Sequence, residues 1–267
     1  MVVDETSEGD LMADRGDDTA RMRNLRAWNI GVGLTLLVEA VAILVLSNGF
    51  SIPVVADVQT GPPGTPLTAQ TTFFDLRFSI GIALFLLLAV ADHLLVASPG
   101  VIGWYERNLR RNINYARWIE YSVSASVMVV LIAMLPGITN LYALIGIFSV
   151  NAVMILFGLL MERVNQDRDE VTWLPFGFGC VAGAVPWICI TVAIVVSTTE
   201  GDGVPGFVYA IFVSLFLLFN CFALNQWLQY RKRGRFADYL FGEKVYLVLS
   251  LVAKSALAWQ VFAGTLN

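Results

Sequence analysis

Charged residues are scarce in this chain: Lys, Arg, Asp and Glu make up 14% of its 267 residues, whereas 57% are hydrophobic. A soluble domain carries about 25% charged residues, so the composition excludes an ordinary soluble fold and indicates an integral membrane protein in contact with lipid. The chain has one histidine and three cysteines, and the cysteines all lie in apolar segments. These counts predict no metal site and no disulfide framework. We also expect no nucleic-acid partner for this membrane protein.

Seven apolar stretches are long enough to cross the roughly 30 Å hydrocarbon core as helices, which takes about 20 residues each. They lie near residues 27–47, 72–97, 115–135, 139–161, 174–197, 205–229 and 243–265. Gly, Pro, Asn or charged residues separate them and end each helix. The sequence predicts an all-α membrane protein, a bundle of seven transmembrane helices.

The positions of the basic residues predict the orientation of this bundle. Arginines and lysines cluster before the first span and in the second, fourth and sixth connections, and the other connections carry none. Only Arg77 and Lys254 depart from the pattern. Because basic residues near span ends stay on the cytoplasmic side, we expect a multi-pass protein of the cell membrane with a cytoplasmic N-terminus and an extracellular C-terminus.

Little of the chain is left outside the spans. Residues 1–20 hold seven acidic residues and one arginine, which predicts a disordered acidic cytoplasmic tail ahead of a helical domain over 21–267. The first extracellular connection, about 48–71, alternates apolar and polar residues before Gly61-Pro62-Pro63-Gly64. This pattern predicts a short β-hairpin-like cap; an irregular lid over the helix ends is the alternative.

Lys254 is the one charged residue in the apolar run from Val245 to Leu266. A lysine near the centre of a membrane helix costs about 2.5–3.5 kcal/mol on insertion scales, so a function usually explains its presence. One such function is covalent attachment of a ligand.

Glu120 is the leading candidate for a partner of Lys254. Glu120 lies nine residues beyond Arg111 and Lys254 ten beyond Lys244, so both are about 14–15 Å deep at 1.5 Å per residue. Arg117, one turn from Glu120, could compete for it or extend toward the interface. The alternative to a functional site is a plain ion pair that joins two helices.

Two stretches of this sequence resemble segments of a known family: SLVAKSALAWQ at residues 250–260 and RWIEYS at residues 117–122. They look like the retinal-bearing seventh helix and the counterion helix of the heliorhodopsin family. Residues 185–188, VPWI, and residues 204–209, VPGFVY, agree as well. The resemblance runs from about residue 27 to 266, and the inverted orientation predicted from the arginines is a distinguishing feature of that family.

The resemblance implies that Lys254 forms a protonated Schiff base with all-trans retinal, which isomerises to 13-cis in light, and that Glu120 is the counterion. Ser250 lies four residues before Lys254 on the same helix face. It is expected to hydrogen-bond the imine or Glu120, or instead to bond back to its own helix. Ser124 is a further residue of the Schiff-base environment.

A polyene needs a long apolar slot with aromatic and thioether walls. Met128, Met154, Trp187 and Phe219 are suitable residue types for it, and the resemblance adds Tyr121, Asn151 and Gly158. Without the resemblance, each is more simply a packing residue.

The resemblance also directs attention to His93, because family members use a histidine at this place near the Schiff base. His93 is a candidate to take up the imine proton, or it forms a structural pair with Asp92. Family members commonly have a second histidine on the first helix, and the matching position in this sequence is Thr35. Glu39 and Asp92 are the other possible proton acceptors.

Three classes of function agree with these residues. The first is a light sensor without enzymatic activity that does not pump ions, read by an unidentified signalling partner and expected as a homodimer in the lipid membrane. The second is a light-driven or light-gated proton transporter or channel. The third is a secondary transporter without retinal, for which the repeat and broken-helix signatures are absent. We favour the sensor because no chain of acids leads from Lys254 to the outer surface.

Overall fold

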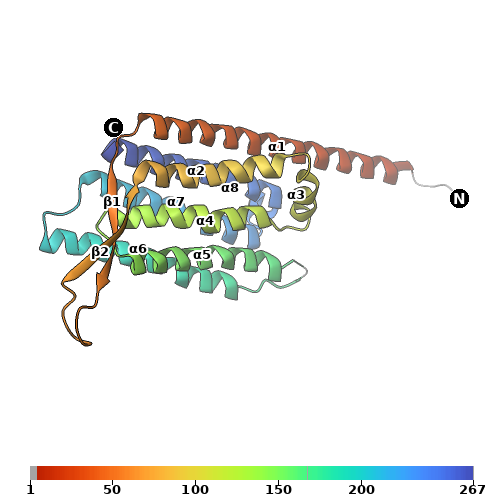
Figure 1. Cartoon of the computed structure of the whole chain (residues 1–267). Helices are drawn as coiled ribbons and strands as arrows, with labels where there is room; N and C mark the ends of the chain where they lie inside the picture. Colours follow the sequence, from red (N-terminus) through yellow and green to blue (C-terminus); the bar gives the residue numbers. More distant parts are fainter. Residues whose placement is uncertain (1–4, 167, 267) are drawn as a thin grey trace.

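A computed structural model describes residues 5–166 and 168–266. Within these ranges, seven helices are long and apolar enough to cross a membrane, and they pack as one bundle (Figure 1). Their bounds are α1 Glu5–Leu46, α2 Phe78–Ala97, α4 Tyr115–Met134, α5 Leu141–Val164, α6 Leu174–Glu200, α7 Gly206–Tyr230 and α8 Tyr239–Val261. The predicted seven-helix fold is confirmed.

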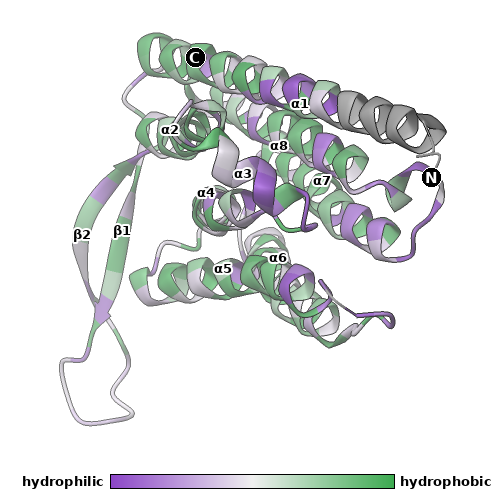
Figure 2. Cartoon of the chain, turned by 90° about the vertical axis from the view of Figure 1, so that its right-hand side faces the viewer, coloured by the Kyte–Doolittle hydropathy of each residue, from purple (hydrophilic) through white to green (hydrophobic). Residues whose placement is uncertain are grey.

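The outer surface of the bundle is apolar. Val38 on α1 is 69% exposed and Val181 on α6 is 70% exposed. Figure 2 shows hydrophobic residues along the helices and hydrophilic residues on α3 and the loops at its end of the bundle. Because lipid tails are as apolar as these side chains, the helix exteriors suit a hydrocarbon solvent.

The first connection forms the predicted hairpin. Strands β1 (Ser51–Val58) and β2 (Ala69–Arg77) pair antiparallel, with a register shift between Val54 and Val55. The Val55 N–H donates to the Thr139 carbonyl at 3.0 Å, which attaches the hairpin to the connection before α5.

The predicted start of the second span, residue 72, is wrong. Residues 72–77 belong to β2, and α2 begins at Phe78. Their β-branched and aromatic side chains favour a strand, and pairing with β1 satisfies their backbone groups.

An additional short helix, α3 (Ile102–Leu109), lies in the second connection, at the end of the bundle opposite the hairpin (Figure 1). Tyr105 and Leu109, spaced four residues apart, are its buried residues. This end carries the basic connections and is called the arginine-rich end below. A 3₁₀ turn (η1, Gly234–Ala237) precedes α8, and a π-helical turn (η2, Phe262–Leu266) continues it.

The backbone of residues 5–20, where we expected a disordered tail, continues α1 as helix. A helix that the span has already nucleated adds one hydrogen bond per residue without a second nucleation cost, which accounts for the difference. Residues 1–4 of the predicted tail lie outside the described residues.

The first and last helices are joined at the hairpin end. The Asn48 N–H donates to the Leu266 carbonyl at 2.9 Å, and its side-chain amide donates to the Thr265 carbonyl at 3.0 Å. This connection holds α1 beside α8, the helix that carries Lys254.

Candidate functional site

The structure brings Lys254 of α8 next to Glu120 of α4. The Lys254 Nζ lies 3.4 Å from the Glu120 Oε1, with both side chains about 95% buried. The same Nζ donates a hydrogen bond to the Ser250 Oγ at 2.8 Å and lies 4.9 Å from the centre of the Tyr121 ring. The ammonium therefore has an anion, a hydroxyl and an aromatic face around it. Ser124, one turn beyond Glu120, is fully buried, and its hydroxyl has no hydrogen-bond partner among the described residues.

Arg117 neither competes for Glu120 nor extends to the interface, so both expectations for this residue are wrong. It is 5% exposed, and its guanidinium pairs with Glu162 of α5 and Glu243 of α8. Two carboxylates offer this guanidinium more compensation than the single Glu120 would, because a buried charge must be both paired and hydrogen-bonded.

Arg117, Glu162, Glu243 and Asn114 form a buried group at the arginine-rich end, called the acid–arginine cluster here. The Asn114 side-chain oxygen caps α4 by accepting from the Arg117 backbone N–H at 3.1 Å. The Asn114 backbone N–H donates to Glu162 at 3.0 Å and its side-chain amide to Glu243 at 2.7 Å. Its amide also lies 3.4 Å from the Tyr105 hydroxyl of α3. Burial, with Glu243 nearby, raises the pKa of Tyr105 well above its ordinary value, so this hydroxyl stays neutral.

Sequence reasoning missed this cluster. Glu162 and Glu243 lie at the ends of predicted spans, where a carboxylate is normally solvated. The signal that was available is that both acids lie at the same end of the bundle as Arg117.

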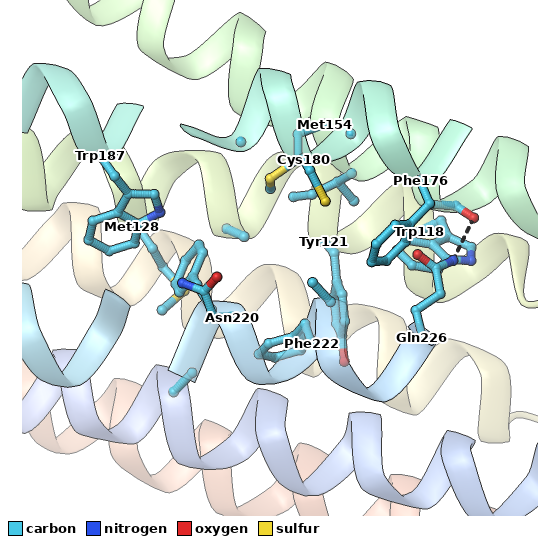
Figure 3. A pocket seen from close by; sticks show the side chains of 18 of the residues that line it. Trp118, Tyr121, Met128, Met154, Phe176, Cys180, Trp187, Asn220, Phe222 and Gln226 are labelled. Carbon is cyan, nitrogen blue, oxygen red and sulfur yellow. Dashed lines mark hydrogen bonds between the residues drawn. The ribbon is translucent and has the colours of Figure 1, made fainter. Parts of the chain in front are cut away.

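An apolar cavity of about 330 Å³ lies beside Lys254. Six of the seven predicted pocket residues line it, together with Lys254 and Ser250: Tyr121, Met128, Met154, Gly158, Trp187 and Phe219. Figure 3 shows Trp187 and Trp118 at opposite ends of this cavity, with Tyr121 between them. The volume is within the roughly 300–1,000 Å³ of small-molecule pockets.

Asn151, the seventh predicted pocket residue, is not among the residues that line this cavity. Its amide donates to the Ser126 Oγ at 3.0 Å and joins α5 to α4 outside the cavity lining. An amide needs polar partners when it is buried, and Ser126 supplies one that the sequence did not indicate.

Further lining residues were not predicted, because a single apolar side chain on a membrane helix has no feature that separates lining from packing. They include Trp118, Ile155, Phe176, Cys180, Phe216, Asn220, Phe222 and Gln226. Gly179 and Gly183 also line the cavity, and a Cβ at Gly183 would lie 2.5 Å from the Met154 sulfur. Their GxxxG spacing therefore permits close packing of α6 on α5 inside the bundle.

A sequence model of the heliorhodopsin family matches residues 25–266. The chain belongs to the heliorhodopsin family. It is also similar in structure to a light-driven proton pump from Leptosphaeria maculans, with 15% identity over 90% of this chain and 94% of the other and a TM-score of 0.61. A cyanorhodopsin from the cyanobacterium Tolypothrix matches with 14% identity over 93% and 94% and a TM-score of 0.60. These two likenesses show the fold. No curated protein matches the chain.

Membership of the heliorhodopsins implies a retinal chromophore, and the residues of this site fit one. A primary amine stands on the wall of an apolar cavity large enough for a small ligand. The Glu120 Oε1 accepts no hydrogen bond from the described residues, so its lone pairs face the Lys254 nitrogen without competition.

The surroundings of His93 differ from those expected for this heliorhodopsin. His93 is 3% exposed, and its Nδ1 lies 2.9 Å from the Asn29 Oδ1 of α1. The Asn29 amide donates to the Leu25 carbonyl at 3.0 Å, so its oxygen faces the ring and His93 Nδ1–H is the donor. The other ring nitrogen, Nε2, has no partner among the described residues and is left with a free lone pair. Thr35 is exposed and bonds back to Gly31, and Asn29 is the α1 residue that hydrogen-bonds the His93 ring.

Asp92 of α2 and Glu39 of α1, the two other candidate proton acceptors, have different surroundings. The described contacts contain no hydrogen bond between Asp92 and His93, so a His93–Asp92 pair is not formed; Asp92 interacts electrostatically with Glu120 and Lys254 instead. The Ser255 hydroxyl lies 2.9 Å from each carboxylate oxygen of Glu39 on α1 and donates to this carboxylate. Ser255 is on a different face of α8 from Lys254.

Removal of one member of the Lys254–Glu120 pair is expected to destabilise the bundle more than removal of both. Glu120→Leu leaves a buried ammonium without its anion, which costs about 3–5 kcal/mol. Adding Lys254→Met to this variant removes the unpaired charge and is expected to recover most of the loss. Thermal unfolding of the retinal-free protein in detergent measures both. A double variant that loses the sum of the two single effects contradicts this account of the pair.

Proposed function

We propose that this protein is a light sensor that binds all-trans retinal and does not pump ions. The observation that carries the proposal is the Lys254–Glu120 pair on the wall of the apolar cavity in a chain of the heliorhodopsin family. When bound, retinal supplies light absorption and the change from all-trans to 13-cis on a Schiff-base link to Lys254.

The chain's own residues prepare Lys254 for this link. A primary amine attacks an aldehyde carbon, and Lys254 presents its amine on the wall of the apolar cavity. Glu120, at 3.4 Å, then stabilises a positive charge held on the same nitrogen and sets how strongly that charge is localised. Ser250, which accepts a hydrogen bond from Nζ, orients the nitrogen toward the cavity.

We propose His93 as the first group to hold the proton that leaves the Lys254 nitrogen in light. Its free Nε2 accepts a proton, while its Nδ1–H is held by Asn29. An amide oxygen is a poor proton carrier, so His93 would store the proton and return it. Asp92 and Glu39 are the alternatives. A stored and returned proton favours sensing over transport.

The distribution of polar groups also favours a sensor. Among the described residues, the buried histidine, arginine and glutamate side chains other than Glu120 lie toward the arginine-rich end: His93, Arg117, Glu162 and Glu243. Toward the other end, Glu39 is followed by acids of the hairpin and of the end of α6, such as Asp57, whose carboxylate accepts from Gln70 and Asn140, and Glu200. A pump needs proton carriers on both sides of the nitrogen. The proposal includes no enzymatic activity; a homodimer and an unidentified signalling partner stay predictions.

Purified protein supplied with all-trans retinal is expected to gain a visible absorption band. Lys254→Ala is expected to abolish it because the attachment point is lost, while the control Lys244→Ala keeps it. Glu120→Gln is expected to shift the band to the red because the localising anion is removed. Absorption spectra measure all three. A colourless wild type, or a coloured Lys254→Ala, contradicts retinal attachment at Lys254.

The proposed orientation places the hairpin outside the cell and the arginine-rich end in the cytoplasm. A membrane-impermeant thiol reagent applied to intact cells is expected to label Gln59→Cys in the hairpin connection and to leave Glu170→Cys unlabelled until the cells are opened. The wild type gives the background from the native cysteines. The reverse labelling would show the opposite orientation.

Illuminated vesicles that contain the retinal-loaded protein are expected to show no light-dependent pH change or current. The light-driven proton pump from Leptosphaeria maculans is a positive control for the assay. A sustained pH change or current from this protein would replace the sensor by the transporter or channel.

A further inference from the structure

The acid–arginine cluster has an unequal number of buried charges. Its single cation, Arg117, faces two carboxylates, Glu162 and Glu243, and each of the three residues is at most 5% exposed. If both acids were ionised, the cluster would hold one uncompensated negative charge. An unpaired charge of this kind is costly in a protein interior, and a bound proton removes the cost.

The contacts of the two acids differ, and they indicate which one holds the proton. Glu162 accepts from four donors: Arg117, the Asn114 backbone, the Trp118 indole at 2.7 Å and the Tyr239 hydroxyl at 3.3 Å. Several donors stabilise the ionised form of a carboxylate, so Glu162 is the better permanent anion.

Glu243 has fewer donors to support a negative charge. Its two oxygens accept from Arg117 and from the Asn114 amide, one each. The other ionisable groups near it are the Glu162 carboxylate and the hydroxyls of Tyr105, Tyr121, Tyr239 and Tyr246, of which Tyr239 also interacts with Glu243 by a side-chain hydrogen bond. None of these hydroxyls adds a positive charge.

Glu243 and Lys254 lie along one buried face of α8. Glu243, Tyr246, Ser250 and Lys254 are buried and follow helical spacing, and Lys254 lies 11 residues after Glu243, about 16 Å along the helix axis. Ser250 bonds to Lys254 Nζ at 2.8 Å, and Tyr121 donates to the Tyr246 carbonyl at 3.0 Å. Hydroxyl groups thus occupy the interval between the cluster and the Lys254 nitrogen.

Tyr246 supplies a buried, unpartnered hydroxyl on this face of α8. Its ring lies 3.9 Å from the Arg117 guanidinium, and its side chain is 1% exposed. Its hydroxyl has no hydrogen-bond partner among the described residues. A hydroxyl both donates and accepts, so this free group is suited to pass a proton from the cluster toward Ser250.

We infer that the acid–arginine cluster stores one proton on Glu243 and that Glu243 returns a proton to the Lys254 nitrogen after light has removed one. In this step the Glu243 O–H bond breaks, a new N–H bond forms at Lys254 Nζ, and the Glu243 carboxylate that remains pairs with Arg117. The group that first took the proton, His93 in our proposal, later passes it back to Glu243, so no proton crosses the membrane. The return step rests on the proposed function; the stored proton does not.

The stored proton is tested on the retinal-free protein in the dark. Infrared spectroscopy is expected to show the C=O stretch of a buried, protonated carboxylic acid that is absent from Glu243→Gln. Asp92→Asn and Glu39→Gln, matched removals of other carboxylates in the spans, are expected to keep it. A band that survives in Glu243→Gln overturns the inference. Should Glu243→Gln fail to fold, Glu243→Asp decides, since a shifted band supports the inference and an unchanged band contradicts it.

The return step is tested by flash photolysis of the retinal-loaded protein. Loss of a general acid typically costs 10²–10⁴-fold, so reprotonation of the Lys254 nitrogen is expected to slow roughly 100-fold in Glu243→Gln and to remain fast in Lys244→Ala. A small weak acid such as formate in the medium is expected to restore the rate in Glu243→Gln, which a purely structural defect would not allow. An unchanged rate overturns Glu243 as the donor. A colourless wild type instead rejects the proposed function, and the dark infrared band still decides whether the proton is stored.

Discussion

A charge inside hydrocarbon must find compensation within the protein, and this constraint orders the bundle around α4. Glu120 and Arg117 lie about one turn apart on this helix and face different partners. Glu120 meets Lys254 of α8, and Arg117 meets Glu162 of α5 and Glu243 of α8. Because breaking either arrangement would leave a buried charge unpaired, the two together fix the depth of α4 and α8 relative to each other.

The cavity and the acid–arginine cluster share one side chain. Trp118 closes one end of the cavity, and its indole N–H donates to Glu162 at 2.7 Å. The ring also lies against Gly158, where a Cβ would come within 2.3 Å of it. Gly158 therefore gives the indole the room it needs to contact the cavity and the cluster at once. A ligand in the cavity that changes shape would therefore press on Trp118, which is hydrogen-bonded to Glu162 of the acid–arginine cluster. Such a contact could carry a signal without the movement of an ion.

The same fold occurs in a light-driven proton pump at 15% identity. Function therefore depends on which polar groups lie on each side of the lysine nitrogen, because a fold alone does not decide function. In this protein the buried His93, Arg117, Glu162 and Glu243 lie toward the arginine-rich end. The other end carries a β-hairpin held to the connection before α5 by the Val55–Thr139 and Asp57–Asn140 bonds.

The sequence by itself determined the seven spans, the hairpin and the depth at which Lys254 and Glu120 lie, because each depends on local properties: the length of an apolar run, alternation along a strand and rise per residue. The family resemblance supplied the pocket residues that periodicity could not separate from packing, with Asn151 the exception. Only the tertiary structure decided which groups pair. Arg117 was expected to compete for Glu120 or to extend toward the interface, and no local pattern pointed to Glu162 or Glu243. These two partners lie 45 and 126 residues from Arg117 in the chain, so rotation and packing of whole helices, which no local pattern encodes, brought them together.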